Sequence, residues 1–253
     1  MDQQVIIDNH LISFRSFNLQ ASNTAVVFLH GWGSSKEAWQ GIEAQLKTSG
    51  QAILLLDLPG FGASPLSKRD LSIADYAALV AGFVKKQGLA KVSIVGHSFG
   101  GRIGIKLAAR YPQLVAKLVL VDSAGFAMGS KQKKIYAMAA RLVRPVFKPA
   151  FMAGLRKSIY QALGAEDYLA TPALQKTFIK AVGEDLAEDM KKIACPTLVV
   201  FGEKDTDTPV EFGERMHKLI AGSELRVLAG AGHYSFLDKP EEFSLLLKGF
   251  ISK

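Results

Sequence analysis

The sequence predicts an α/β protein whose core is a doubly wound, mostly parallel sheet, with a helical cap inserted into it. Apolar runs of strand length recur along the chain, and helical patterns separate them. Such continuous apolar runs are typical of parallel strands that are covered on both faces. Between about 126 and 190 a basic, largely helical stretch interrupts this alternation, which resumes afterwards. An insertion over one edge of the sheet explains that interruption.

The expected strands and helices can be placed by residue range. The first two strands, 11–17 (LISFRSF) and 24–30 (TAVVFLH), are rich in β-branched and aromatic residues and lie between turn-prone segments. The other expected strands are 51–57, 91–96, 117–122, 196–202 and 224–228. Helical patterns cover 36–46, 72–86, 101–111, 211–220 and 240–250. This alternation places ligands beyond the carboxyl ends of the strands.

The domain organisation that follows is a core made of residues 1–125 and 191–253 and a cap made of residues 126–190. The chain carries a net charge of +8, and its residues 124–165 contain eight Lys or Arg and no Asp or Glu. Two interpretations of this basic cap stay open. It is a solvated helix face, or it attracts an anionic partner such as an acyl-carrier protein, a phosphate-bearing acyl donor or an anionic lipid surface.

Composition excludes several classes of protein. An apolar fraction of 49% with 21% charged residues is that of a globular protein. The longest apolar stretches are too short to cross a bilayer, and the first residues lack the features of a signal peptide. Cys195 is the only cysteine, so no internal disulfide can form, and we expect a cytoplasmic protein.

Partners and cofactors are constrained in the same way. The sequence has no recognisable nucleic-acid module, so the basic charge is not taken to indicate nucleic-acid binding. No pair among the five histidines has the spacing of metal ligands, and we expect neither a metal nor another cofactor. The oligomeric state is left open.

The segment GHSFGG (96–101) predicts a nucleophilic serine. Ser98 lies between Gly96 and Gly100, at the point where a buried strand gives way to a helix. In such a turn the serine takes a strained backbone conformation and its hydroxyl projects above the sheet, while a Cβ two positions away on either side would clash. We therefore predict that Ser98 occupies a nucleophile elbow.

A nucleophilic serine needs a base, and His233 is the best candidate. His10 and His217 fit solvent-facing positions, and the side chain of His97 should leave the turn away from the neighbouring serine. His30 fits a structural hydrogen-bonding role. His233 lies in a glycine-rich loop after the 224–228 strand, at a strand carboxyl end and after the serine in chain order.

Two further roles complete the predicted site. The segment LHGWG (29–33) leaves backbone amides exposed around Trp32, and we expect the amides of Trp32 and Phe99 to form an oxyanion hole. Three carboxylates are candidates to orient the histidine. Asp205 and Asp207 follow the 196–202 strand, Asp122 ends the 117–122 strand, and loop position favours Asp205.

Together these motifs resemble the α/β-hydrolase superfamily over nearly the whole chain. HGWG resembles its oxyanion loop, DLPGFGAS (57–64) the loop after the next strand, GHSFGG its elbow and GAGHYSFLDKPEEF its histidine loop. The segment GEKDTDTP resembles its G-x-x-D-x-x-x-P acid loop, which implies that Asp205 is the acid. HGWG and DLPGFG are also similar to pimeloyl-acyl-carrier-protein methyl ester esterases, although those have a tryptophan before the serine.

The resemblance implies a cofactor-free serine hydrolase that cleaves a small-molecule carboxylic ester with Ser98, His233 and Asp205. A serine nucleophile argues against the members of the superfamily that use aspartate. Two alternatives within enzymes are hydrolysis of a carbon–carbon bond or lactone by the same triad, and hydrolysis of an acyl-carrier-protein ester. The alternative outside enzymes is a ligand-binding receptor or scaffold on the same fold.

Overall fold

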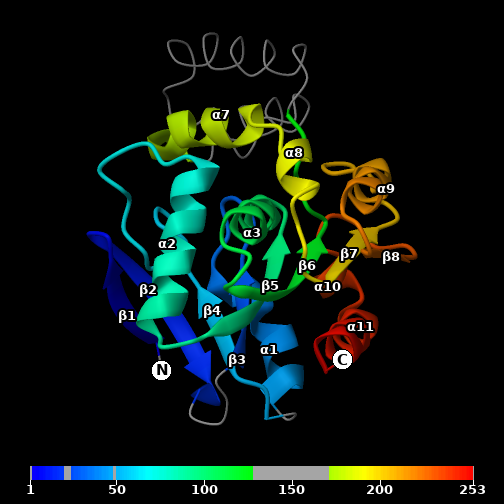
Figure 1. Ribbon diagram of the computed structural model, residues 1–253, viewed down its shortest axis with the longest axis horizontal. Helices are drawn as coiled ribbons and strands as arrows, with labels where there is room; N and C mark the ends of the chain where they lie inside the picture. The colour runs from blue at the N-terminus through cyan, green and yellow to red at the C-terminus, as the bar shows by residue number, and fades with distance from the viewer. Residues whose placement is uncertain (1, 20–23, 48–49, 128–170, 253) are drawn as a thin grey trace, which may run out of the picture.

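The computed structural model of the protein describes residues 2–19, 24–47, 50–127 and 171–252 (Figure 1). In these residues one eight-stranded sheet has the order β1-β2-β4-β3-β5-β6-β7-β8. The strands are β1 (Asp2–Ile7), β2 (His10–Phe17), β3 (Thr24–Leu29), β4 (Ile53–Leu56), β5 (Lys91–His97), β6 (Val115–Val121), β7 (Thr197–Gly202) and β8 (Glu224–Leu228).

The sheet is mostly parallel, as predicted. Strands β4, β3, β5, β6, β7 and β8 pair in parallel, and Leu29 of β3 is in register with Gly96 of β5. Only β1 and β2 run antiparallel to their neighbours. Strand β1 was not predicted, because Asp2, Gln3 and Gln4 are exposed at the sheet edge and leave no apolar run to recognise.

Helices cover both faces of the sheet. The helical elements are η2 (Lys36–Trp39), α1 (Gln40–Lys47), α2 (Ile73–Lys86), α3 (Phe99–Arg110), η4 (Pro172–Leu174), α7 (Gln175–Gly183), α8 (Ala187–Met190), α9 (Val210–Leu219), α10 (Ser235–Asp238) and α11 (Pro240–Ser252). The helix predicted over 72–86 is present and begins with a capping box between Ser72 and Asp75. The pattern over 36–46 instead begins as a 3₁₀ turn, capped by Ser35.

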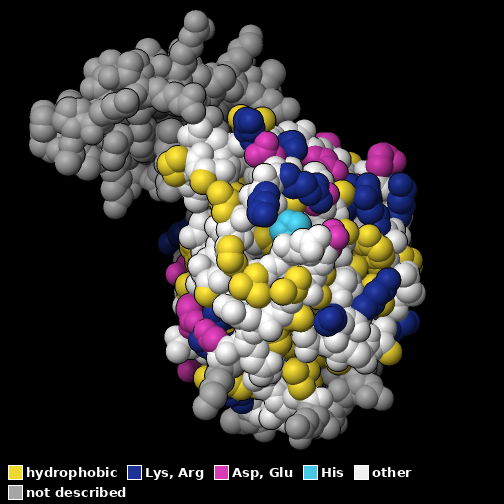
Figure 2. Space-filling view, turned by 90° about the vertical axis from the view of Figure 1, so that its left-hand side faces the viewer, with side chains coloured by type: hydrophobic (Ala, Val, Ile, Leu, Met, Phe, Trp, Pro, Cys, Tyr) yellow, Lys and Arg dark blue, Asp and Glu magenta, His cyan; other side chains and the backbone are white. Residues whose placement is uncertain are grey.

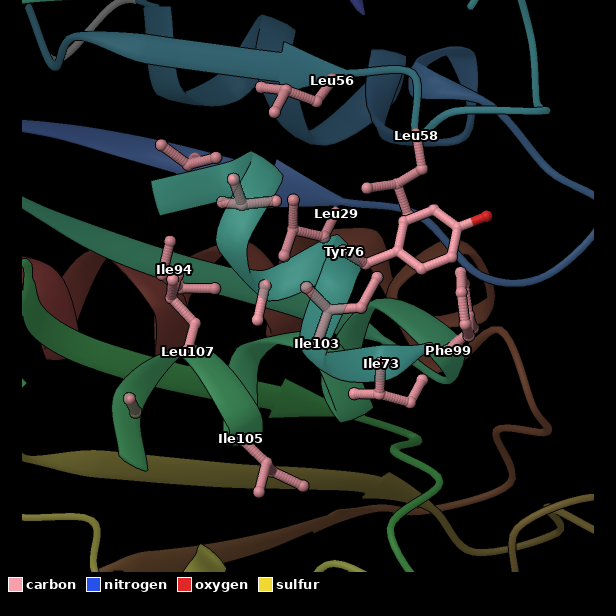
Figure 3. Packing of buried hydrophobic residues seen from close by; sticks show 14 of the residues in the cluster. Leu29, Leu56, Leu58, Ile73, Tyr76, Ile94, Phe99, Ile103, Ile105 and Leu107 are labelled. Carbon is pink, nitrogen blue, oxygen red and sulfur yellow. The ribbon is translucent and has the colours of Figure 1, made fainter. Parts of the chain in front are cut away.

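The strand side chains alternate between two buried clusters. Val27 and Leu29 pack in the cluster of α2 and α3, whereas Val26 and Phe28 pack in the cluster of α1 and α11. Figure 3 shows the first cluster, with Ile103 and Leu107 of α3 beside the strands. Burial on both faces explains why the strands read as continuous apolar runs.

Most of the predicted cap, residues 128–170, lies outside the described residues. The part that is described contains η4, α7 and α8, and α7 lies at the end of the molecule toward which β5 and β6 point (Figure 1). The division into core and cap therefore stays a prediction. Among the described helices, none combines the length and the apolar character needed to span a bilayer.

Candidate active site

Ser98 lies at the sharp turn between β5 and α3. Its backbone angles are φ 48° and ψ −106°, a conformation that is uncommon for any residue other than glycine. The turn is held by the amide of Ser98, which donates to the carbonyl of Val121 on the neighbouring strand at 3.0 Å. This strained geometry is that predicted for the elbow.

The glycines on either side of Ser98 are required by close backbone approach. A Cβ at Gly96 would lie 2.5 Å from the carbonyl oxygen of Gly100, and a Cβ at Gly100 would lie 2.3 Å from the carbonyl oxygen of Leu29. Both contacts are with backbone, which cannot move aside as a side chain can. The strand, the turn and the helix therefore pack together only because these positions lack side chains.

His233 and Asp205 form a hydrogen-bonded pair at the carboxyl edge of the sheet. Nδ1 of His233 lies 2.8 Å from Oδ2 of Asp205. Asp205 follows β7 and its side chain is inaccessible to solvent, whereas His233 lies in the loop after β8 and remains partly accessible. The structure thus brings together a histidine and a carboxylate that are 28 positions apart in the sequence.

The surroundings of the pair favour an ionised Asp205. Burial disfavours ionisation of Asp205, but hydrogen bonds from His233 and Thr208 outweigh it and hold the pKa of Asp205 below its usual value. Burial likewise opposes protonation of His233, and the hydrogen bond and charge of Asp205 reverse that effect and raise the pKa of His233. The ionised carboxylate of Asp205 then accepts a hydrogen bond from the Nδ1–H group of His233.

The other oxygen of Asp205 is engaged by its own loop. Oδ1 accepts from the amides of Asp207 and Thr208, each at 2.9 Å, and the Thr208 hydroxyl lies 2.7 Å from Oδ2. A carboxylate oxygen of Asp205, one of Asp207 and a ring nitrogen of His233 all lie within 4.8 Å of one another, a spacing that metal ligands also have. Because both oxygens of Asp205 already accept hydrogen bonds, this group fits the orientation of a histidine better than coordination of an ion.

His97 connects the elbow to the histidine loop, a role that sequence reasoning missed. Its ring is buried, and Nε2 donates to the carbonyl oxygen of His233 at 2.8 Å. Burial lowers the pKa of His97 to about 3, so the ring is neutral and acts only as a hydrogen-bonding brace. The ring centroids of His97 and His233 are 4.9 Å apart. Because His97 directly precedes Ser98, this contact places His233 next to the elbow.

Among the residues that the structure describes, Asp122 forms no hydrogen bond with a histidine. Its buried carboxylate accepts from the backbone amides of Gly202 at 2.8 Å and Ser235 at 2.9 Å. Burial raises the pKa of Asp122 to about 7. Asp207 is exposed, and its backbone amide donates to Asp205. Of the three candidate acids, Asp205 alone hydrogen-bonds to His233 among the described contacts.

The loop expected to form the oxyanion hole lies against the elbow. A Cβ at Gly31 would lie 2.6 Å from Nδ1 of His97 and 3.6 Å from Cβ of Ser98. The rings of Trp32 and Phe99 meet edge to face, with centroids 5.0 Å apart. Phe99 is the first residue of α3, where helix amides have no partner within the helix. The loop that carries Trp32 therefore packs against the elbow at Gly31, and the oxyanion role of the two amides stays a prediction.

The remaining histidines have structural partners. The amide of Leu58 donates to Nε2 of His30, whose Nδ1 then donates to the carbonyl of Gly31 at 2.7 Å. Burial lowers the pKa of His30 to about 4, so it links two loops as a neutral ring. His10 is hydrogen-bonded to the hydroxyl of Ser67, and His217 is hydrogen-bonded to the hydroxyl of Ser223.

Comparisons with known proteins identify the family and the fold. The chain is 30% identical to the pimeloyl-[acyl-carrier protein] methyl ester esterase of Neisseria meningitidis serogroup B, over 89% of this chain and 92% of the esterase. It is 25% identical to a 2-hydroxy-6-oxononadienedioate/2-hydroxy-6-oxononatrienedioate hydrolase of a Pseudomonas species, over 90% and 88%. An esterase from Exiguobacterium antarcticum superposes with a TM-score of 0.81 at 23% identity, covering both chains completely. A model of the alpha/beta hydrolase family matches residues 26–244, and the chain belongs to that family.

Proposed function

We propose that the protein is a serine hydrolase that cleaves a carboxylic ester through an acyl-enzyme intermediate. The observation that carries the proposal is the 2.8 Å hydrogen bond between His233 and Asp205, together with the strained elbow at Ser98, whose neighbour His97 packs against His233. A histidine whose Nδ1 proton is held by a buried carboxylate keeps the lone pair on Nε2, the atom that a general base needs.

In the proposed mechanism Ser98 attacks the ester carbonyl while His233 accepts its proton. His233 then donates that proton to the leaving alcohol, and the acyl group stays on Ser98. Water, activated by His233, attacks the acyl-enzyme, which releases the acid and restores the serine. Asp205 stabilises the imidazolium that forms in each half of the reaction, consistent with the raised pKa of His233.

The negative oxygen of the tetrahedral intermediate is assigned to the amides of Trp32 and Phe99. Phe99 begins α3, so the positive end of the helix dipole adds to the stabilisation of developing charge. A lost oxyanion donor typically costs about 3–4 kcal/mol of transition-state stabilisation. Loss of either donor is therefore expected to lower kcat by about 10²–10³-fold.

Two related reactions use the same groups and remain alternatives. The Pseudomonas relative is named as a hydrolase of a dienedioate, and a lactone is an internal ester that the same attack would open. Ester cleavage is favoured because a relative with 30% identity, over 92% of its own length, is named as a methyl ester esterase. A non-catalytic receptor is disfavoured, because binding alone needs neither a strained serine nor a paired histidine and carboxylate.

We further propose residues 126–190 as a cap that sets substrate choice, and an anionic or carrier-bound ester as one class to test. On the face that Figure 2 shows, Lys and Arg side chains gather toward the upper end, with acidic side chains among them. In the described part of the chain Arg69 pairs with Asp75 at 2.9 Å, and Lys180 donates to the carbonyl of Asp70. Unbalanced positive charge is therefore expected mainly from residues 131–157.

A panel of activated esters of increasing acyl length tests the proposal, run with the unsubstituted protein and with Ser98→Ala. We expect turnover of at least one ester and labelling by a fluorophosphonate probe, with both lost in Ser98→Ala while the melting temperature is retained. Labelling that persists in Ser98→Ala would place the nucleophile elsewhere. Absence of both turnover and labelling in the unsubstituted protein would reject the proposed function.

A further inference from the structure

Helix α3 carries two buried cations directly after the elbow. Arg102 and Lys106 follow Ser98 by one and two helical turns, on one stripe of the helix, and each is only 4% exposed. Arginine and lysine are rarely buried unless they are paired. Neither residue contributes to the proposed chemistry, so their burial needs a separate explanation.

Arg102 fastens two distant segments to the helix. Its guanidinium donates to the carbonyl of Phe126 at 2.5 Å and to the carbonyl of Glu184 at 2.8 Å. Both carbonyls belong to the predicted cap (126–190), with Phe126 at its start and Glu184 near its end. The amide of Leu186 also donates to the carbonyl of Gly125 at 2.9 Å, which joins the two segments to each other.

Lys106 forms ion pairs with the segment 184–189. Its ammonium group lies 2.8 Å from the carboxylate of Glu184 and also pairs with Asp189. Glu184 and Asp189 are themselves partly exposed, with side-chain exposures of 32% and 16%. The two cations therefore bind three partners on residues 184–189, one carbonyl and two carboxylates.

The segment that is anchored in this way reaches the predicted oxyanion loop. The indole Nε1 of Trp32 donates to the hydroxyl of Thr171 at 3.0 Å. The ring of Phe178, on α7, meets the ring of Trp32 edge to face with centroids 5.0 Å apart. Leu174 of η4 packs over Gly60, which has no side chain to hold it off. Leu174 and Phe178 thus bring apolar side chains against the loops that carry Gly60 and Trp32.

We propose that Arg102 and Lys106 are positioning residues that hold the 171–190 segment against Trp32, so that Phe178 and Leu174 bind the acyl chain of the substrate. The inference rests on the proposed ester hydrolysis. Removal of one partner from a buried ion pair leaves the other charge uncompensated, and the anchored segment must loosen to hydrate it. Loosening removes contacts with a long acyl chain and with the Trp32 ring, whereas the backbone of the Trp32 loop stays packed against the elbow at Gly31 and keeps the reacting atoms in place.

Lys106→Met keeps most of the side-chain length and removes its charge. Glu184→Gln removes the charge of one of its partners at a partly exposed position. Lys191→Met is the matched control, because Lys191 is exposed and pairs only with the exposed Glu188 in the contacts described. For both test variants we expect KM for an octanoate ester to rise about tenfold, with kcat for octanoate and both constants for an acetate ester nearly unchanged. The control should resemble the unsubstituted protein.

Iodide quenching of tryptophan fluorescence tests the anchoring without any turnover. The chain has two tryptophans, and Trp39 is fully buried, so increased quenching reports on Trp32. We expect increased quenching in Lys106→Met and in Glu184→Gln but not in Lys191→Met. If Lys106→Met does not fold, Glu184→Gln decides the question.

Two results would overturn the inference. One is unchanged quenching in the folded test variants; the other is an equal loss of kcat/KM for acetate and octanoate. Failure of the proposed function looks different, because no ester would then be hydrolysed and no probe would label Ser98 in the unsubstituted protein. The quenching measurement would still report whether the two cations hold the segment.

Discussion

The carboxylate of Asp122 accepts a hydrogen bond from the backbone amide of Ser235, 113 positions further along the chain, at 2.9 Å. Its other oxygen accepts from the amide of Gly202 at 2.8 Å. Gly202 ends β7, directly before the loop that carries Asp205, and Ser235 follows His233 by two positions. Asp122 therefore ties together the two loops that bring the acid and the histidine into contact, without touching the histidine in the contacts described.

Asp122→Asn is expected to destabilise the fold more than it impairs chemistry. An asparagine has one amide oxygen, so its NH₂ group would face one of the two backbone amides and leave it without an acceptor. A buried unsatisfied donor costs about 1–3 kcal/mol. Chemical denaturation at pH 6 is the cleanest measurement. Below the pKa of about 7 the wild-type carboxyl is mostly protonated, so the substitution removes little charge there.

The kinetic counterpart of that experiment compares Asp122→Asn with Asp205→Asn. At temperatures well below unfolding we expect kcat of Asp122→Asn to stay within about tenfold of the unsubstituted protein, because it acts only through loop position. A loss as large as that of Asp205→Asn would show that Asp122 serves the chemistry directly.

Asp205→Asn should lower kcat by about three to four orders of magnitude and shift its pH dependence. The base works only when His233 is neutral, so activity falls as pH drops through the pKa of His233. Asp205 raises that pKa through its hydrogen bond and charge. Its removal should move the acidic limb of the kcat/KM profile to lower pH. A limb that stays in place, or moves upward, would mean that another group titrates.

Gly100→Ala and Gly249→Ala form a matched pair that tests the packing of the elbow. A Cβ at Gly100 would lie 2.3 Å from the carbonyl oxygen of Leu29, whereas a Cβ at Gly249, in α11, meets nothing within 4 Å. We expect Gly100→Ala to lower the free energy of unfolding by several kcal/mol and to abolish activity. Gly249→Ala should raise the free energy of unfolding by about 0.5–1 kcal/mol, because alanine favours a helix. Similar changes in both would contradict the close approach at the elbow.

Much of the fold could be predicted because burial on both faces leaves a direct imprint on the sequence. The 224–228 strand was predicted with its observed bounds, and the helix predicted over 72–86 begins one residue later, at Ile73. Strand β1 was missed because an edge strand held by backbone pairing needs no apolar run. The short helix α10 was missed because its four residues give no helical period to detect.

The candidate site was predictable to the extent that its roles have local motifs. Ser98 and His233 lie in glycine-rich turns, and their positions follow from those turns. The bracing roles of His97 and Asp122 have no local signal, because both depend on contacts with loops more than 75 positions away. The partners of Arg102 were equally hidden, since a buried cation in a helix looks like a solvated one until its carbonyl partners are known.

The basic residues of the predicted cap lead to a test by salt. Lys131, Lys133, Lys134, Arg141, Arg144, Lys148, Arg156 and Lys157 lie outside the described residues, so the prediction rests on their charge alone. Attraction of an anionic carrier acts over a Debye length of about 10 Å at 0.1 M salt and weakens as salt is added. We expect kcat/KM for an acyl-carrier-protein ester to fall steeply with salt, while that for a small neutral ester barely changes.

Reversal of charge at Arg141 and Arg144 should flatten the steep salt dependence of kcat/KM for the acyl-carrier-protein ester. The same reversal at Lys85 and Lys86, exposed in the last turn of α2, should leave it unchanged. Parallel, shallow curves for both esters would identify the basic face as a solvated surface, because a steered encounter cannot be independent of salt.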